Sequence, residues 1–127
     1  AIEIADFRVA RTAGIDVRDI TADIGAAGGV VIGKTPVLLR DIDICAVNTT
    51  LVINGEARAK GAADQVMGNP LSTVAWLANK LHELGRTLEP GDIILSGAML
   101  AAQPIEAGDT VLARFDHGLG DIQLRFK

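Results

Sequence analysis

The first nine residues, AIEIADFRV, place a carboxylate where a strand would present apolar side chains. Side chains alternate between faces along a strand, so Glu3 shares its face with Ala1, Ala5, Phe7 and Val9. Burying an unpaired carboxylate is costly, but Mg²⁺ or Mn²⁺, which prefer oxygen ligands, would stabilise it. The pattern makes Glu3 a candidate metal ligand. A salt bridge with Arg8 or with a neighbouring strand remains the alternative.

Two further patterns could carry chemistry. Ser96 and Gly97, in the stretch SGAML, would expose a hydroxyl and backbone N–H groups in a loop of small residues. Such loops can hold a carboxylate or an oxyanion, although a tight exit from a strand explains the same residues equally well. Asp41 and Asp43 form a D-x-D pair that fits the wet face of a strand better than a metal site.

Motifs of several enzyme classes are absent from the sequence. It contains no P-loop, GxGxxG, CxxC, HExxH or GxSxG pattern. His82 and His117 have no partner at metal-ligand spacing, and both are expected to be solvated.

Composition narrows the class of protein. The chain has 127 residues, enough for one domain, and we expect residues 1–127 to form a single domain. A net charge of −4 and 3% aromatic residues argue against nucleic acid as a partner. The sole cysteine, Cys45, cannot form an internal disulfide, which fits a cytoplasmic location. Hydrophobic residues make up 49% without any membrane-length run, which indicates subunit or domain contacts.

The order of predicted elements is strands, one helix, then strands. We expect a short helix or turn near 16–22, a strand in GVVIG (29–33) and a hairpin over 37–60 that turns at Asn54-Gly55. A clear helix spans 70–84, with Asn69 as N-cap and Gly85 as C-cap. Strands follow within LEPGDIILSGAML, QPIEAGDTVLARF and HGLGDIQLRFK. The class is therefore β-rich α+β.

Several segments together resemble one enzyme family. AIEIADFR, TADIGAAGGVVIG, LVINGEARAKGAADQVMGNPLSTVAWLANKL, LEPGDIILSGAML and PIEAGDTVLARFDHGLGDIQLRF occur in this order. The chain resembles the C-terminal half of the 2-hydroxypenta-2,4-dienoate (2-oxopent-4-enoate) hydratases and 4-oxalocrotonate decarboxylases of the fumarylacetoacetate hydrolase superfamily. The resemblance implies a mixed β-roll or barrel-like sheet with one main helix. It also implies a whole chain about twice as long, as a start at Ala1 in mid-strand suggests.

The resemblance also implies site residues. Family members hold Mg²⁺ with three acidic residues, of which Glu3 is the third by position. The other two, and a catalytic lysine, belong to the N-terminal half. Asp23 falls in a loop that borders the pocket, although Ile24 and Ala26-Ala27 replace the asparagine and serines common there. Ser96 and Gly97 match the loop that faces the substrate. We therefore expect Asp23 and Ser96 to be catalytic, and Ser96 and Gly97 to bind substrate.

The implied activity belongs to meta-cleavage degradation of aromatic compounds. A metal-stabilised dienolate would ketonise to the conjugated enone, and water would then add at the far carbon of that enone to give 4-hydroxy-2-oxopentanoate. A decarboxylase would form the same dienolate by losing carbon dioxide. There are two further alternatives. One is a carbon–carbon bond hydrolase of the superfamily, and the other is a non-catalytic half-length partner subunit. The resemblance also implies a small 2-oxo acid substrate and a homo-oligomer, with a possible association between hydratase and decarboxylase.

Overall fold

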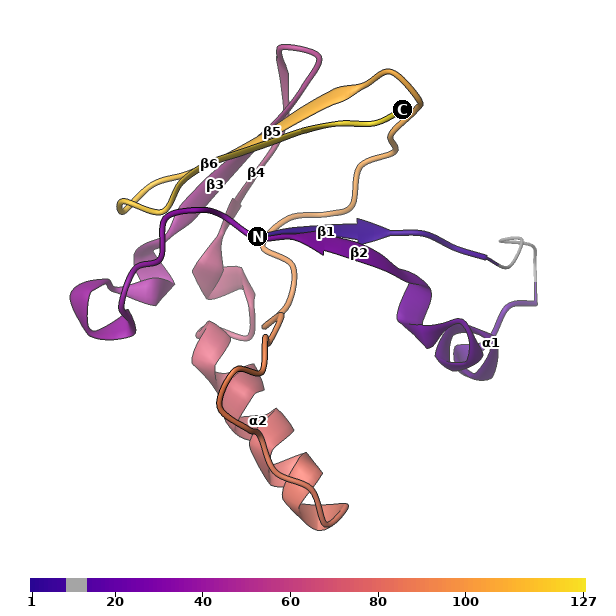
Figure 1. The fold of residues 1–127 in the computed structure, drawn as a ribbon, viewed down its shortest axis with the longest axis vertical. Helices are drawn as coiled ribbons and strands as arrows, with labels where there is room; N and C mark the ends of the chain where they lie inside the picture. Colours follow the sequence, from indigo (N-terminus) through magenta and orange to yellow (C-terminus); the bar gives the residue numbers. More distant parts are fainter. Residues whose placement is uncertain (9–13) are drawn as a thin grey trace. The chain divides into compact units, whose positions relative to one another are not determined.

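The computed structural model describes residues 1–8 and 14–127. The chain divides into two compact units, residues 1–34 and residues 35–127. Figure 1 labels their helices and strands. Val9, part of the strand expected at the N-terminus, lies outside the described residues.

The first unit contains a two-stranded antiparallel sheet. Strand β1 (Ile2–Ala5) pairs with β2 (Ala27–Val31), with a bulge between Ile4 and Ala5. The β2 strand confirms the strand predicted around GVVIG, displaced by two residues toward the N-terminus.

The predicted short helix is present as α1 (Val17–Ala22). The Asp16 carboxylate accepts hydrogen bonds from the backbone N–H groups of Arg18 and Asp19, and the Asp19 side chain accepts one from the Asp16 N–H. This reciprocal capping satisfies N–H groups that the first turn of a helix leaves without partners. A short 3₁₀ helix, η1 (Ile24–Ala26), then leads into β2.

The second unit is built on a four-stranded antiparallel sheet in the order β4-β3-β5-β6. Asn54 and Gly55 turn the chain between the first two strands with φ of 52° and 85°, which confirms the predicted hairpin turn. Ile53, Val111, Ala113 and Ile122 are buried on one face of the sheet. The strands are β3 (Asn48–Ile53), β4 (Glu56–Ala62), β5 (Thr110–Phe115) and β6 (Gly120–Arg125).

The main helix is α2 (Pro70–Glu83), as predicted. The Asn69 side chain accepts a hydrogen bond from the Leu71 N–H at its start. At its end Gly85, in the left-handed region, follows the C-cap Leu84 rather than being the C-cap itself. The N–H groups of residues 85 and 86 bond to the carbonyls of residues 82 and 81, which is a Schellman motif.

Two similar sequences, EPGD and EAGD, form the same turn. In each, the final aspartate accepts a hydrogen bond of 2.8 Å from the N–H of the first glutamate, Glu89 or Glu106. The second turn is also joined to the hairpin, because Asn54 Nδ2 donates to Asp109 Oδ1 at 2.7 Å and Asn54 Oδ1 accepts from the Thr110 N–H. The hydrogen bonds from the Glu106 N–H and from Asn54 lower the pKa of Asp109.

Two predicted strand segments are wrong. Residues 39–46, expected in the hairpin, contain the 3₁₀ helices η2 (Leu39–Asp41) and η3 (Ile44–Ala46). The Asp43 carboxylate accepts a hydrogen bond from the Cys45 N–H, a local bond that competes with strand pairing. The IILS segment, 93–96, has no strand assignment, and Ile93 and Leu95 are exposed. A fourth 3₁₀ helix, η4 (Ala63–Gln65), follows β4.

The β-rich α+β class with one main helix is confirmed. The four-stranded sheet stays open and does not close into a barrel in the described part of the chain. Among the helices of residues 1–8 and 14–127, none is long and apolar enough to cross a membrane.

Candidate functional site

Glu3 lies in β1 opposite Val30 of β2, and both residues are exposed. Ile2 and Ile4, on the other face of the strand, are half-buried. The prediction that Glu3 shares the buried face is therefore wrong. The two isoleucines bury more apolar area than the alanines beside Glu3 would, so they take the inner face. An exposed carboxylate at this position is accessible to a cation.

Asp23 is buried and bound by Arg8. The Arg8 Nε donates to Asp23 Oδ1 at 2.6 Å, and the Arg8 backbone N–H donates to Asp23 Oδ2 at 3.2 Å. The Asp23 side chain is 3% exposed, against 47% for Arg8. The sequence suggested Arg8 as a partner for Glu3, but the structure assigns it to Asp23 instead. The Asp23 carboxylate is thus committed to an ion pair with good hydrogen-bond geometry.

The loop after Asp23 has an unusual backbone. Ile24, Gly25 and Ala26 all have positive φ, at 56°, 66° and 61°. Left-handed backbone disfavours residues other than glycine, and a β-branched residue there is an outlier. The Ile24 side chain is 73% exposed, so no burial of this side chain offsets the strain. Strain of this kind persists only when its surroundings hold it.

Ser96 and Gly97 lie in the second unit, next to the start of α2. The Thr73 Oγ1 lies 2.8 Å from the Ser96 carbonyl oxygen and 2.7 Å from the Pro70 carbonyl oxygen, so its single hydrogen is shared between the two. Gly97 has φ of +124°, and a Cβ there would lie 3.0 Å from Val66 Cγ1. The conformation and the close neighbour both favour glycine. The helix and the buried Val66 thus fix the position of this loop.

A second glycine, which the sequence did not single out as a site residue, holds the same loop against the sheet. Gly61 of β4 is buried, and a Cβ there would lie 2.0 Å from the Met99 carbonyl oxygen and 2.6 Å from its carbon. Only a residue without a side chain lets the backbone of the SGAML stretch approach β4 this closely. Gly61 to Ala63 form a G-x-A motif within one of the segments that resemble the family. Its glycine therefore has a packing reason.

The predicted site residues belong to two different units. Glu3 and Asp23 lie in residues 1–34, and Ser96 and Gly97 lie in residues 35–127. The first unit joins Asp23 to Arg8, and the second places Ser96 and Gly97 in one loop. The Arg8–Asp23 pair had no local signal in the sequence, because 15 residues separate the partners.

A metal site would need several oxygen ligands. Within residues 1–8 and 14–127, no group of three or more His, Cys, Asp or Glu side chains could hold an ion. The Glu3 carboxylate fits a hard cation by donor type and exposure, but it fits as one ligand and not as a complete site. Asp41 and Asp43 are exposed, as expected, although they lie on 3₁₀ turns rather than on a strand.

The surroundings of His117 confirm that it is a turn residue. Its Nδ1 lies 2.7 Å from Asp116 Oδ1, and the Asn48 N–H and Nδ2 donate to the same carboxylate. These contacts, with that of His117 the strongest, lower the pKa of Asp116 to about 2. The cluster fixes the turn after β5 to the start of β3.

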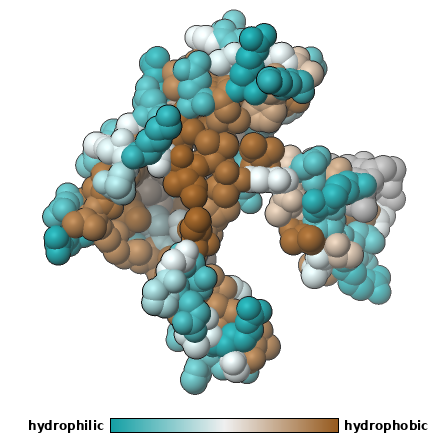
Figure 2. All heavy atoms as spheres, in the orientation of Figure 1, coloured by the Kyte–Doolittle hydropathy of each residue, from teal (hydrophilic) through white to brown (hydrophobic). Residues whose placement is uncertain are grey.

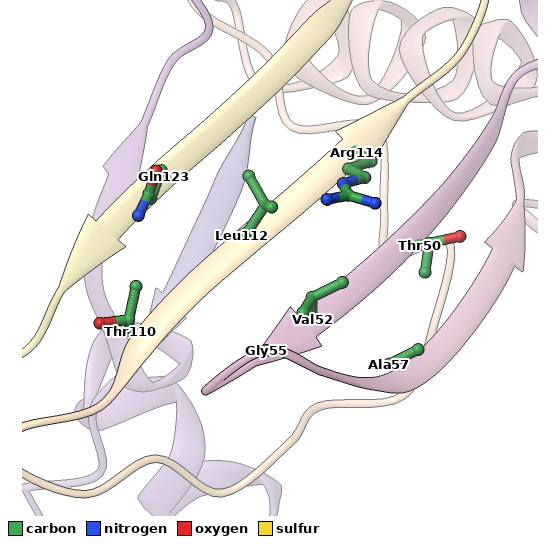
Figure 3. A pocket seen from close by; sticks show the side chains of 8 residues that line it. All are labelled: Thr50, Val52, Gly55, Ala57, Thr110, Leu112, Arg114 and Gln123. Atoms are coloured by element: carbon green, nitrogen blue, oxygen red, sulfur yellow. The ribbon is translucent and has the colours of Figure 1, made fainter.

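A hollow of about 340 Å³ lies on one face of the four-stranded sheet (Figure 3). None of the predicted site residues lines it, so it is distinct from the predicted site. Its lining residues are Thr50, Val52, Gly55, Ala57, Thr110, Leu112, Arg114 and Gln123.

Comparison with known proteins gives consistent matches along the chain. The chain is 40% identical over 126 residues to the 2-keto-4-pentenoate hydratase of Burkholderia vietnamiensis. This alignment covers 99% of the chain and 47% of the relative. The chain is 33% identical over 125 residues to the 4-oxalocrotonate decarboxylase of Pseudomonas putida, covering 98% of this chain and 47% of the relative. The chain spans about half the length of the curated relatives it matches.

Solved structures of one of these enzymes also match the fold of this chain. The 4-oxalocrotonate decarboxylase of Pseudomonas putida complexed with magnesium and adipate matches with a TM-score of 0.85 at 32% identity, over 92% of this chain and 44% of that chain. The same enzyme complexed with calcium and acetate matches with a TM-score of 0.80 at 34% identity. The fumarylacetoacetate (FAA) hydrolase C-terminal family matches residues 10–127. The chain therefore belongs to the fumarylacetoacetate hydrolase C-terminal family.

Proposed function

We propose that residues 1–127 form the C-terminal catalytic portion of a divalent-metal-dependent hydratase about twice as long. The enzyme adds water to 2-hydroxypenta-2,4-dienoate to give 4-hydroxy-2-oxopentanoate in the meta-cleavage degradation of aromatic compounds. The observation that carries this proposal is the 40% identity to 2-keto-4-pentenoate hydratases over nearly the whole chain. The decarboxylases match at 33% and 31% identity, which ranks them second.

Glu3 would provide one carboxylate ligand to Mg²⁺ or Mn²⁺. Its exposure on β1 and the magnesium and calcium in the related structures support this role. When bound, such a cation supplies Lewis-acid stabilisation of negative charge on the substrate oxygens. Further ligands would come from outside the described residues.

Ser96 and Gly97 would bind the substrate carboxylate or enolate oxygen. The left-handed Gly97 is exposed, and backbone N–H groups in a loop of small residues can bind an anion. The bond from Thr73 to the Ser96 carbonyl keeps this loop in place without using the Ser96 hydroxyl. Asp23 stays a predicted catalytic residue, although a direct role would require its ion pair with Arg8 to open.

The decisive experiment is product analysis on the full-length polypeptide that carries these residues. With Mg²⁺ and 2-hydroxypenta-2,4-dienoate, we expect 4-hydroxy-2-oxopentanoate. Release of carbon dioxide from 4-oxalocrotonate, without hydration of the dienoate, would assign the decarboxylase instead. No turnover of either substrate would favour a non-catalytic partner subunit.

A metal-ligand variant tests the site. Glu3→Gln removes a charged ligand while retaining the size of the side chain, so we expect loss of Mg²⁺-dependent turnover with an unchanged circular dichroism spectrum. Glu56→Gln is a matched control, because Glu56 is an exposed strand carboxylate in the second unit. If Glu3→Gln turns over substrate as fast as Glu56→Gln does, Glu3 is not a metal ligand.

The proposed enzyme also forms oligomers in the cytoplasm. Large apolar side chains are exposed, among them Trp76 at 63% and Ile93 at 66%, and Figure 2 shows apolar areas open to solvent on the face in view. Exposed apolar surface of this kind is typical of subunit or domain contacts. A free Cys45 fits a reducing compartment. Sedimentation velocity of the full-length polypeptide tests the assembly, and a monomer would contradict it.

A further inference from the structure

The Arg8 guanidinium binds both ends of the strained loop at residues 24–26. Before the loop, Arg8 donates to the Asp23 carboxylate and, through Nη2, to the Asp23 carbonyl. After the loop, its Nη1 donates to the Ala27 carbonyl at 3.2 Å. One side chain thus closes a segment whose three residues all have positive φ.

The backbone directly after β1 also holds this loop. The Asp6 N–H donates to the Ala26 carbonyl at 2.8 Å. Gly28 lies so close to β1 that a Cβ there would be 2.7 Å from Asp6 Cβ and 2.9 Å from the Ile4 carbonyl oxygen. The loop is therefore attached to the end of the strand that carries Glu3.

The Asp23 carboxylate is poorly placed for direct chemistry. Its side chain is 3% exposed, and both of its oxygens accept hydrogen bonds from Arg8. A group that exchanges a proton with substrate or water needs access to it. A buried carboxylate paired with a guanidinium instead has a fixed geometry, which is the property that positions neighbouring groups.

We propose that Arg8 is a positioning residue that holds residues 24–26 in place. Asp23 contributes by binding the Arg8 guanidinium. The pair locks the loop 24–26 onto β1, and this fixes the strand that presents Glu3. The inference rests on the proposed function for its effect on turnover, but the locking itself is a property of the first unit. A misplacement of about 1 Å in an active site can reduce turnover on the order of 100-fold.

The test compares four variants of the full-length polypeptide: Arg8→Met, Arg8→Lys, Asp23→Asn and the double variant Arg8→Met/Asp23→Asn. We expect each of Arg8→Met and Asp23→Asn to lower kcat by about 10- to 100-fold. The double variant should lose no more than Arg8→Met alone, because Arg8→Met already removes the ion pair together with the bonds to the Asp23 and Ala27 carbonyls. Arg8→Lys should recover part of kcat, since it retains the positive charge. The pH profile of kcat should keep its shape in Asp23→Asn.

Arg18→Met is the matched control. Arg18 lies in the same unit, but its side chain is 88% exposed and donates its hydrogen bonds to Asp16. We expect wild-type kcat from this variant. A wild-type kcat in Arg8→Met would overturn the proposal. Loss of one limb of the pH profile in Asp23→Asn would also overturn it, because that result would make Asp23 a direct acid or base.

A structural readout separates this proposal from the proposed function. Amide hydrogen exchange of the peptide around residues 23–28 should become faster in Arg8→Met and Asp23→Asn, but not in Arg18→Met. If the wild type shows no hydratase turnover, the proposed function fails while the exchange result still tests the lock. Unchanged exchange in Arg8→Met would overturn the lock whatever the activity.

Discussion

Gly61→Ala should destabilise the second unit far more than an ordinary glycine-to-alanine change in a strand. The new Cβ would lie 2.0 Å from the Met99 carbonyl oxygen, whereas ordinary contact begins at 3.4 Å. The neighbour is backbone and not a flexible side chain, so the SGAML stretch or β4 must move by more than about 1 Å. Gly61 does not need a left-handed backbone, so the effect is purely one of space.

The expected loss follows from overpacking. Extra atoms forced into a packed site cost about 1–3 kcal/mol, and we expect about 3 kcal/mol here because backbone must shift. With a urea slope of about 2 kcal/mol/M, the unfolding midpoint should fall by about 1.5 M. Far-ultraviolet circular dichroism at neutral pH, in the full-length polypeptide, measures this transition. Turnover should also fall, because Ser96 and Gly97 belong to the displaced stretch.

Gly29→Ala is the control for this prediction. Gly29 also lies in a strand without positive φ, but nothing lies within 4 Å of its added Cβ. We expect a change in free energy of unfolding within about 0.5 kcal/mol. Equal midpoints for the two variants would refute the close approach of Met99 to Gly61, and with it the packing reason for the G-x-A motif.

Three further predictions concern stability. Ile24→Asn should raise the free energy of unfolding by about 1 kcal/mol, since asparagine tolerates the left-handed backbone and an exposed isoleucine loses little packing; a lower unfolding midpoint would contradict the strain. Asn69→Ala should cost about 1 kcal/mol through loss of the cap of α2, and an unchanged midpoint in urea would argue against it. Because the pKa of Asp116 is lowered from 3.8 to about 2, its contribution is present above pH 3.8 and is lost as the pH falls through about 2. The midpoints of wild type and Asp116→Asn should therefore differ at pH 5 and converge near pH 2, and a constant difference would contradict the assignment.

Elements with local signals could be predicted from the sequence. The helix α2 has Asn69 and Pro70 at its start and Gly85 just past its end, and the hairpin turns at Asn54-Gly55. These residues act through bonds to their near neighbours, so the chain around them carries enough information.

Features that depend on distant partners could not be predicted. The apolar segment 93–96 reads as a strand, but a strand needs a neighbour for its backbone groups, and the described structure assigns it none. The prediction for the inner face of β1 is wrong because the two isoleucines bury more apolar area than the alanines on the face of Glu3. The Arg8–Asp23 pair joins residues 15 apart in the sequence, and no pattern within the strand indicates which carboxylate Arg8 binds.

The pairing of β3 with β5, beside which Asn54 binds Asp109, has a consequence for how the second unit folds. Strand pairs β3–β4 and β5–β6 are hairpins that close short loops. The pairing of β3 with β5 instead joins distant residues, from Ile53 with Val111 to Thr49 with Phe115. Closing a long loop costs entropy before its contacts can repay it. We therefore expect both hairpins and α2 to form quickly, and the pairing of β3 with β5 to limit the folding rate. Substitutions that remove the Asn54–Asp109 hydrogen bond should slow refolding more than substitutions at residues 118–119, which lie in the local turn between β5 and β6.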